Sequence, residues 1–171
     1  MANTFQLIAS TTVGAGGASS IDFTSIPSTY TDLCLKISAR HSGSSVANAF
    51  FIKFNGNTSS YSYRYLEGAG SGTPGSSFGS TRNAGVENGN TSTANTFSSA
   101  EIYIPNYAGS NNKSYSSDSV VENNATLGIQ WFLAGLWSNT AAITSISIQP
   151  DTSPNAYVQY STAYLYGVKN A

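Results

Sequence analysis

The chain has 171 residues, which is the size of one domain, and only 9% of them are charged, against about 25% in a typical soluble domain. The formal net charge is −1 and the seven lysines and arginines are scattered, so charge-driven disorder is excluded, and nucleic acid and anionic membranes are not expected as partners. The chain holds 29 serines, 17 threonines and 16 asparagines, so its surface must consist largely of hydroxyl and amide groups. Its 40% of hydrophobic residues, with 11 tyrosines among them, are enough for a core.

The N-terminal residues MANTFQLIAS contain neither a basic segment nor an apolar run of the kind found in secretory signals. No stretch approaches the 18 or so apolar residues that a membrane-spanning helix needs. The single cysteine, Cys34, cannot form a disulfide within the chain, which is typical of synthesis in a reducing compartment. We therefore expect the protein to be made and folded in a cytoplasm.

Apolar and polar residues alternate in many short runs, which predicts strands with one buried and one wet face. In residues 31–40, for example, Leu33, Leu35 and Ile37 share one face, while Lys36 and Arg40 share the other. Strands are expected at residues 4–13, 20–26, 31–40, 50–54, 61–66, 100–105, 114–121, 127–137, 142–150 and 156–168, the last of which can be two strands. Residues 14–20, with three glycines, are expected to turn the chain between the first two strands.

Residues 50–54 and 61–66 are predicted to form a hairpin. Asn55-Gly56 between them can adopt the positive φ angles that tight turns require, and Tyr61, Tyr63 and Tyr65 alternate with polar positions after it.

These elements predict an all-β fold, in which the whole chain (1–171) forms one β-sandwich of jelly-roll or immunoglobulin-like topology. The number of strands does not choose between the two topologies. Residues 67–99 hold 7 of the 16 glycines and are expected to form one long Gly/Ser/Asn-rich loop. Such a loop is either functional or a solvated linker between the halves of the sandwich.

No set of residues predicts catalysis or a metal site. The one histidine, His41, lacks a nucleophile motif, although Asp22 or Asp32 could orient it, and Cys34 lies in no catalytic signature. One histidine and one cysteine are too few for zinc, and the spacing of the eight acids nominates no glycosidase pair. A structural calcium ion at Asp151, Asn155 or residues 88–90 is the least remote alternative. We therefore expect no enzymatic activity and no cofactor.

Five aromatic residues are candidates for stacking on a ligand such as a sugar: Trp131, Trp137, Tyr61, Tyr63 and Tyr65. Core packing is the favoured alternative for the tryptophans, because Trp131, Leu133 and Trp137 fall on the same strand face as Ile129.

Five segments carry a resemblance to a known class of proteins. They are IDFTSIPSTYTDLCLKISAR at 21–40, FIKFNGNTSSYSYRYLEG at 51–68, EIYIPNYAGSNNKS at 101–114, AGLWSNTAAITSISIQP at 134–150 and YSTAYLYGV at 160–168. In these segments the chain resembles small β-sandwich virion proteins of marine tailed phages. Such proteins decorate or cement capsids, or form part of head and tail fibres, commonly as trimers.

The resemblance implies a non-enzymatic virion protein, made in the host cytoplasm, whose partners are the major capsid protein or other virion proteins. A homotrimeric capsid decoration protein is expected first, and a receptor- or carbohydrate-binding module that recognises a host surface glycan is the alternative. The resemblance assigns no functional residues. From their place at the chain end and in the long loop, the candidate capsid contacts are Ala2, Asn3, Thr4, Phe5, Phe78, Arg82 and Phe97.

Overall fold

The computed structural model describes residues 4–70, 72–125 and 127–169. This part of the chain forms twelve β-strands and no helix, so the prediction of an all-β fold is confirmed. No helix of the described residues could therefore cross a membrane.

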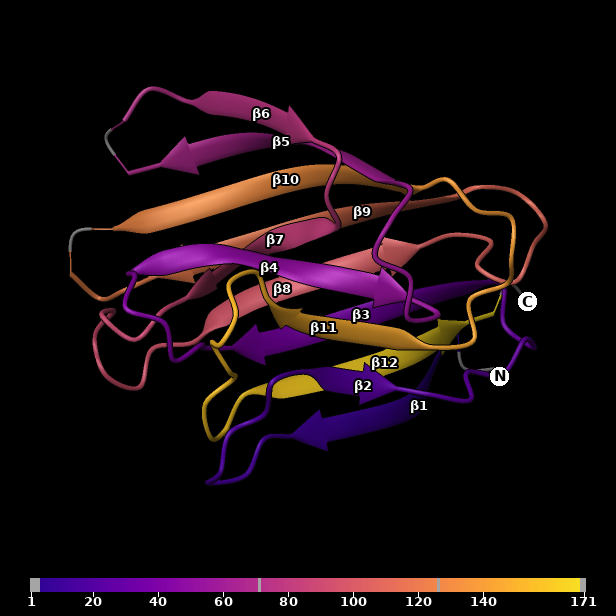
Figure 1. Cartoon of the computed structure of the whole chain (residues 1–171), viewed down its shortest axis with the longest axis horizontal. Helices are drawn as coiled ribbons and strands as arrows, with labels where there is room; N and C mark the ends of the chain where they lie inside the picture. The colour runs from indigo at the N-terminus through magenta and orange to yellow at the C-terminus, as the bar shows by residue number, and fades with distance from the viewer. Residues whose placement is uncertain (1–3, 71, 126, 170–171) are drawn as a thin grey trace.

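Two antiparallel sheets pack face to face (Figure 1). The large sheet has eight strands, in the order β1 (Phe5–Thr12), β12 (Thr162–Val168), β3 (Asp32–Ala39), β8 (Ser98–Ile104), β9 (Lys113–Glu122), β10 (Gly128–Trp137), β5 (Tyr61–Ala69) and β6 (Gly75–Gly79). The small sheet has four strands, in the order β2 (Ile21–Phe23), β11 (Ile146–Pro150), β4 (Ala47–Phe54) and β7 (Asn83–Asn88). The prediction of a β-sandwich is therefore confirmed.

The core lies between the sheets and is built from the apolar faces that the alternation predicts. Leu33, Leu35 and Ile37 of β3 belong to the same buried apolar cluster as Ile52 and Phe54 of β4 in the small sheet, and all five residues are at most 5% exposed. Burial of this apolar area is the main term that holds the two sheets together.

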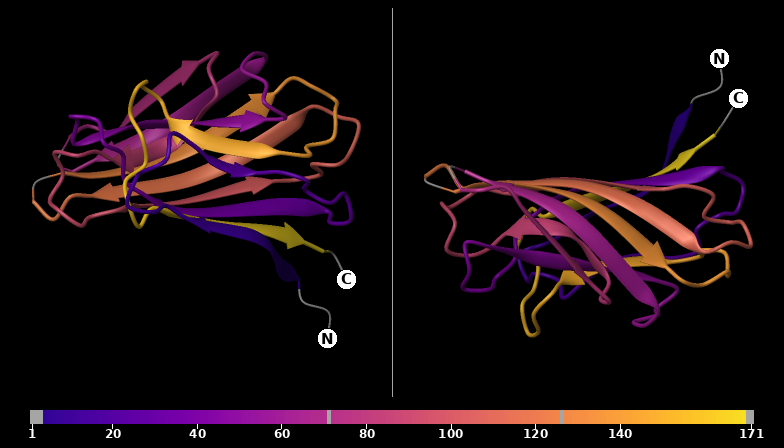
Figure 2. Two further views of the ribbon diagram at one scale, coloured as in Figure 1. Left: turned by 60° about the horizontal axis from the view of Figure 1, so that its bottom comes forward. Right: turned by 90° about the horizontal axis from the view of Figure 1, so that it is seen from above.

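The small sheet covers only part of the large one. Its edge strand β7 packs against β8, β9 and β10, whereas β5 and β6 lie beyond it (Figure 1). Figure 2 shows the same arrangement from two further sides, with the large sheet twisted along its whole width. We call β9, β10, β5 and β6 the four-strand extension, because they continue the large sheet past β8.

The predicted hairpin of residues 50–54 and 61–66 is wrong, although its turn forms. Asn55 and Gly56 have positive φ angles of 52° and 71°, and the Asn57 N–H donates to the Phe54 carbonyl. However, β4 before the turn belongs to the small sheet and β5 after it to the large sheet. The turn therefore serves a crossing between the sheets, where the side chain of Asn55 bonds to backbone groups of residues 142, 144 and 145.

The prediction of one long loop at residues 67–99 is also wrong. The segment contains β6, which pairs with β5, and β7, which pairs with β4. Every residue of β7 is buried, so no alternation of wet and dry positions marks it as a strand. β6 is a short strand that consists of glycine, serine and one phenylalanine.

Candidate functional site

The outer face of the four-strand extension is the side of the large sheet that points away from the core. Residues directly opposite each other in an antiparallel ladder point to the same face, so the register of the strands defines two rows of side chains on it. One row runs Asp118, Phe132, Leu66 and Ser76, from β9 to β6, and the next runs Ser116, Ala134, Arg64 and Phe78.

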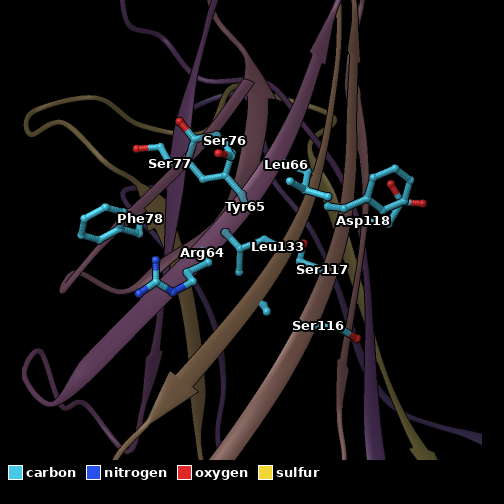
Figure 3. Close-up of a pocket in the computed structure, with 12 residues that line it drawn as sticks. Arg64, Tyr65, Leu66, Ser76, Ser77, Phe78, Ser116, Ser117, Asp118 and Leu133 are labelled. Atoms are coloured by element: carbon cyan, nitrogen blue, oxygen red, sulfur yellow. The ribbon is translucent and has the colours of Figure 1, made fainter. Parts of the chain in front are cut away.

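Three large apolar side chains of these rows are open to solvent: Leu66 is 62% exposed, Phe78 69% and Phe132 54%. Together with the neighbouring strand positions they line a groove of about 760 Å³ (Figure 3). Large apolar side chains scattered singly on a surface are ordinary, but a contiguous group on one sheet face marks a contact surface.

One cation and one anion lie on opposite sides of this groove. Arg64 on β5 holds its guanidinium carbon 4.8 Å from the ring centroid of Phe78, and Figure 3 shows both at one side and Asp118 on β9 at the other. Asp118 accepts a hydrogen bond from the side-chain amide of Gln130 at 3.3 Å. Among the described residues the one ion pair joins Lys36 to Glu101, so neither Arg64 nor Asp118 has an oppositely charged partner there.

Of the exposed side chains on this surface, only Phe78 is among the candidate contact residues predicted from the sequence. Leu66 carries a signal that could have found it, because it is an apolar residue on a face of β5 that otherwise presents Ser62 and Arg64. Phe132 carries no such signal, because its face of β10 also holds Ala134 and Leu136. Arg64 and Asp118 carry no such signal, since only the pairing of β5 and β9 with β10 brings them to one face.

The opposite face of the extension carries an aromatic stack. Tyr65 and Trp131 lie parallel with ring centroids 4.1 Å apart, and Tyr63 stacks on Tyr65 at 6.0 Å. All three are half-buried, because the small sheet stops short of β5. Burial raises the pKa of the Tyr65 hydroxyl. These three rings remain candidates for stacking on a ligand.

Tyr61 and Trp137 are excluded as residues that stack on a ligand. They are 4% and 0% exposed, and both pack against Phe54 in the core. The ring of Tyr61 stacks on the indole of Trp137 at 6.2 Å, and the Tyr61 hydroxyl accepts a hydrogen bond from the Phe54 N–H. A ligand cannot reach either side chain without unfolding this part of the sandwich.

The structure does not bring the candidate capsid contacts to one place. Thr4 and Phe5 lie at β1, on one edge of the large sheet, whereas Phe78 lies on β6 at the other edge. Arg82 precedes β7 and places its guanidinium over the ring of Phe51, and Phe97 is half-buried. Ala2 and Asn3 lie outside the described residues.

The residues considered for catalysis are also apart. His41 is buried and its Nδ1 accepts a hydrogen bond from the Gly43 N–H, and burial lowers its pKa. Asp22 bonds to Ser20, and Asp32 accepts bonds from the Tyr103 hydroxyl and the Asn106 N–H, so neither orients His41. Cys34 is buried, and burial is the main reason that its pKa rises to about 11.

Nor do the oxygen-rich segments form a metal centre in the described part of the chain. No group of three or more His, Cys, Asp or Glu side chains is placed there to hold an ion. The Asp151 carboxylate instead accepts hydrogen bonds from Asn48 and Thr152. The amide of Asn88 is buried and bonds to Ser92.

One buried acid, Glu87, is not marked by any pattern in the sequence. Glu87 on β7 is 1% exposed, and burial raises its pKa well above the ordinary range. The charge of Asp151 acts in the same direction, while the buried Tyr157 hydroxyl lowers the pKa. Burial therefore favours the protonated, neutral form of the Glu87 carboxyl.

Comparisons of the chain with protein-family models, with curated proteins and with solved structures found no match.

Proposed function

We propose that the protein is a non-enzymatic structural protein of a tailed-phage virion, and that it acts as a capsid decoration protein. The observation that carries this proposal is the exposed apolar outer face formed by Leu66, Phe78 and Phe132. A stable soluble domain does not gain from exposing three such side chains together, whereas a protein that docks on other proteins does.

The sheet face also has the form of a protein contact. It is open along its strands and carries one charge on each side of an apolar strip, which resembles the apolar centre and polar rim of protein interfaces. A surface of hydroxyls and amides around it suits a protein that sits in many copies on one particle. Each added contact then acts at high effective concentration and stabilises the assembled shell.

The order of the strands supports a jelly-roll topology within this proposal. In β1-β12-β3-β8 and β2-β11-β4-β7 the chain alternates between the sheets, and the hairpins β5–β6 and β9–β10 extend the large sheet. Double-sheet jelly rolls occur in viral capsid proteins and also in lectins, so this topology is compatible with decoration and with glycan binding.

Within the same proposal, the partners are the major capsid protein or other virion proteins. The exposed side chains of Phe5 and Leu7 on the edge strand β1 are the candidate contacts at the end of the large sheet away from the groove. Edge strands are natural docking elements because their outer backbone groups are unpaired.

Immunogold labelling of intact phage particles, with antibodies raised against the purified protein, tests the proposal. Gold distributed over the head is expected. Gold confined to the tail would overturn the decoration role, and particles that bind no gold would overturn the virion assignment.

A second candidate function is glycan binding, and the half-buried stack of Tyr63, Tyr65 and Trp131 favours it. Aromatic faces pack well on sugar rings. In a Trp137→Phe variant, Trp131 is the one remaining tryptophan, so its fluorescence reports on this stack directly. A shift of its emission on addition of host polysaccharide supports glycan binding, and unchanged emission at saturating polysaccharide rejects this site.

A further inference from the structure

We propose that the outer face of the four-strand extension pairs with the same face of a second copy of this chain, across a two-fold axis. This pairing rests on the proposed function, because that function makes the outer face a protein contact. The partner at this face is a second copy of the chain.

When a second copy of the chain is related by a two-fold axis, the charges on its outer face are complementary to those on the outer face of the first copy. Arg64 lies on β5 and Asp118 on β9, one row apart, with β10 between them. The midpoint between the two is on β10, between Phe132 and Ala134. A two-fold axis that passes over this midpoint, parallel to the sheet and perpendicular to the line from Arg64 to Asp118, places each Arg64 opposite the partner's Asp118.

The same operation covers the apolar strip. Phe132 and Leu66 are opposite each other in the β10–β5 ladder and lie next to the axis, so the two strips meet in the middle of the contact. Isologous interfaces place one self-complementary patch against itself in this way. The pairing buries Phe132 and Leu66 at the centre, with Arg64 and Asp118 on either side of them and Phe78 beyond Arg64 on the edge strand.

The remaining charges near the face agree with this pairing. Glu101 is the neighbour of Asp118 across the β8–β9 ladder, and Lys36 binds Glu101 at 2.5 Å. The acidic side of the groove therefore keeps a net negative charge, and the other side carries Arg64. A chain with unlike charges on the two sides of an apolar strip attracts an inverted copy of itself and repels a copy in the parallel orientation.

The test is the mass of the purified full-length protein in solution, measured by light scattering and sedimentation over a wide range of concentration. We expect a dimer of twice the 17.9 kDa chain mass in equilibrium with monomer. Because the pairing depends on two contacts between opposite charges, the dimer is expected to weaken as salt is added. A strictly monomeric protein, or a trimer as the resemblance implies, would overturn the two-fold pairing. The labelling of particles would be unaffected by that failure, so the two proposals fail separately.

Charge reversal identifies the face. Arg64→Glu alone and Asp118→Arg alone are each expected to raise the dimer dissociation constant roughly tenfold or more, because like charges then oppose each other twice. The double variant restores opposite charges and is expected to recover most of the affinity. Phe132→Ser, which removes the apolar centre, is expected to abolish the dimer.

Lys53→Glu is the matched control, since it makes the same change in net charge as Arg64→Glu on β4 of the small sheet. It should leave the dimer intact. Circular dichroism and thermal unfolding confirm that each variant is folded, which is expected because Arg64, Asp118 and Phe132 are exposed. Single reversals that leave the dimer unchanged, or a double variant no better than the singles, would show that another surface makes the dimer.

Discussion

Tyr115 and Gly135 are opposite each other in the β9–β10 ladder, and the tyrosine ring lies directly over the glycine. A Cβ atom at position 135 would overlap the ring atoms of Tyr115, which is itself fixed by a hydrogen bond from its hydroxyl to the Asn83 carbonyl. The pair joins the four-strand extension to β7, because the ring reaches from β9 to the residue where β7 begins.

Gly135→Ala is therefore expected to destabilise the protein by about 1–3 kcal/mol, the usual cost of forcing an extra methyl group into a packed core. Urea unfolding followed by circular dichroism measures the change in the free energy of unfolding. Gly68→Ala is the control, since a Cβ at position 68 on the same extension meets nothing within 4 Å. Equal stability of the two variants would contradict the packing described for Tyr115.

Glu87→Gln tests the buried carboxyl. The folded-state pKa of Glu87 is raised by burial above the unfolded value of about 4.3, so its contribution to stability is complete below that value and is lost as the pH rises toward the folded pKa. The variant carries no charge at any pH. We expect it to match the wild type near pH 4, to gain up to about 1.4 kcal/mol relative to it for each pH unit between the unfolded and the folded pKa of Glu87, and to gain no more above the folded pKa.

Thermal or urea unfolding gives the two pH profiles. A scan from about pH 4 to about pH 9 brackets the range in which proteins are usually most stable. Glu67→Gln, the same substitution at a half-buried position of β5, is the control for the loss of one acid from the chain. Parallel profiles for Glu87→Gln and wild type would show that Glu87 is not held neutral by burial.

Arg40→Lys tests a turn that depends on one guanidinium. The two terminal nitrogens of Arg40 donate to the carbonyls of Asn90, Ser92, Thr93 and Thr96 at 2.8–3.1 Å, and the residue is 7% exposed. A lysine ammonium cannot reach all four carbonyls in this planar arrangement. A loss of about 1–3 kcal/mol is expected from the unsatisfied groups.

Amide hydrogen exchange locates the effect of this variant. The exchange rate is expected to increase in residues 89–97, with little change in the core strands. Arg64→Lys, at an exposed position, serves as the control and should change neither quantity. Uniform exchange across the whole chain would indicate that Arg40 does not hold this turn.

Cys34 is expected to be unreactive in the folded protein. Its thiol is 1% exposed and its pKa of about 11 keeps it protonated near neutral pH, whereas the thiolate is the reactive form. Ellman's reagent should label the protein only after it is unfolded in urea. Rapid labelling of the folded chain would show that β3 opens readily at this position.

The sequence predicts the strands well where one face is wet and the other is dry. β9 alternates between buried and exposed positions along its whole length and β3 alternates from Leu35 onward, and the sequence predicts both within a residue or two of their bounds. β7 was missed because it is buried on both faces, and β6 because its glycines and serines carry no apolar period.

The sequence pattern does not predict which strands pair with each other. The Asn55-Gly56 turn has the same local geometry in a hairpin and in a crossing between sheets, and what decides between them is the pairing of β4 with β7 and β11. The candidate site depends on such pairings throughout. Leu66 and Phe132 meet only because β5 pairs with a strand that follows it by about sixty residues.

That same pairing affects the order in which the chain can fold during synthesis. The hairpin of β5 and β6 leaves the ribosome early, but the strand on which it docks, β10, is made only after β7, β8 and β9. A two-stranded hairpin alone is marginally stable in water. Until β10 emerges, Tyr61, Tyr63 and Tyr65 have no sheet beside them, so this part of the growing chain is where a chaperone or a neighbouring nascent chain would bind.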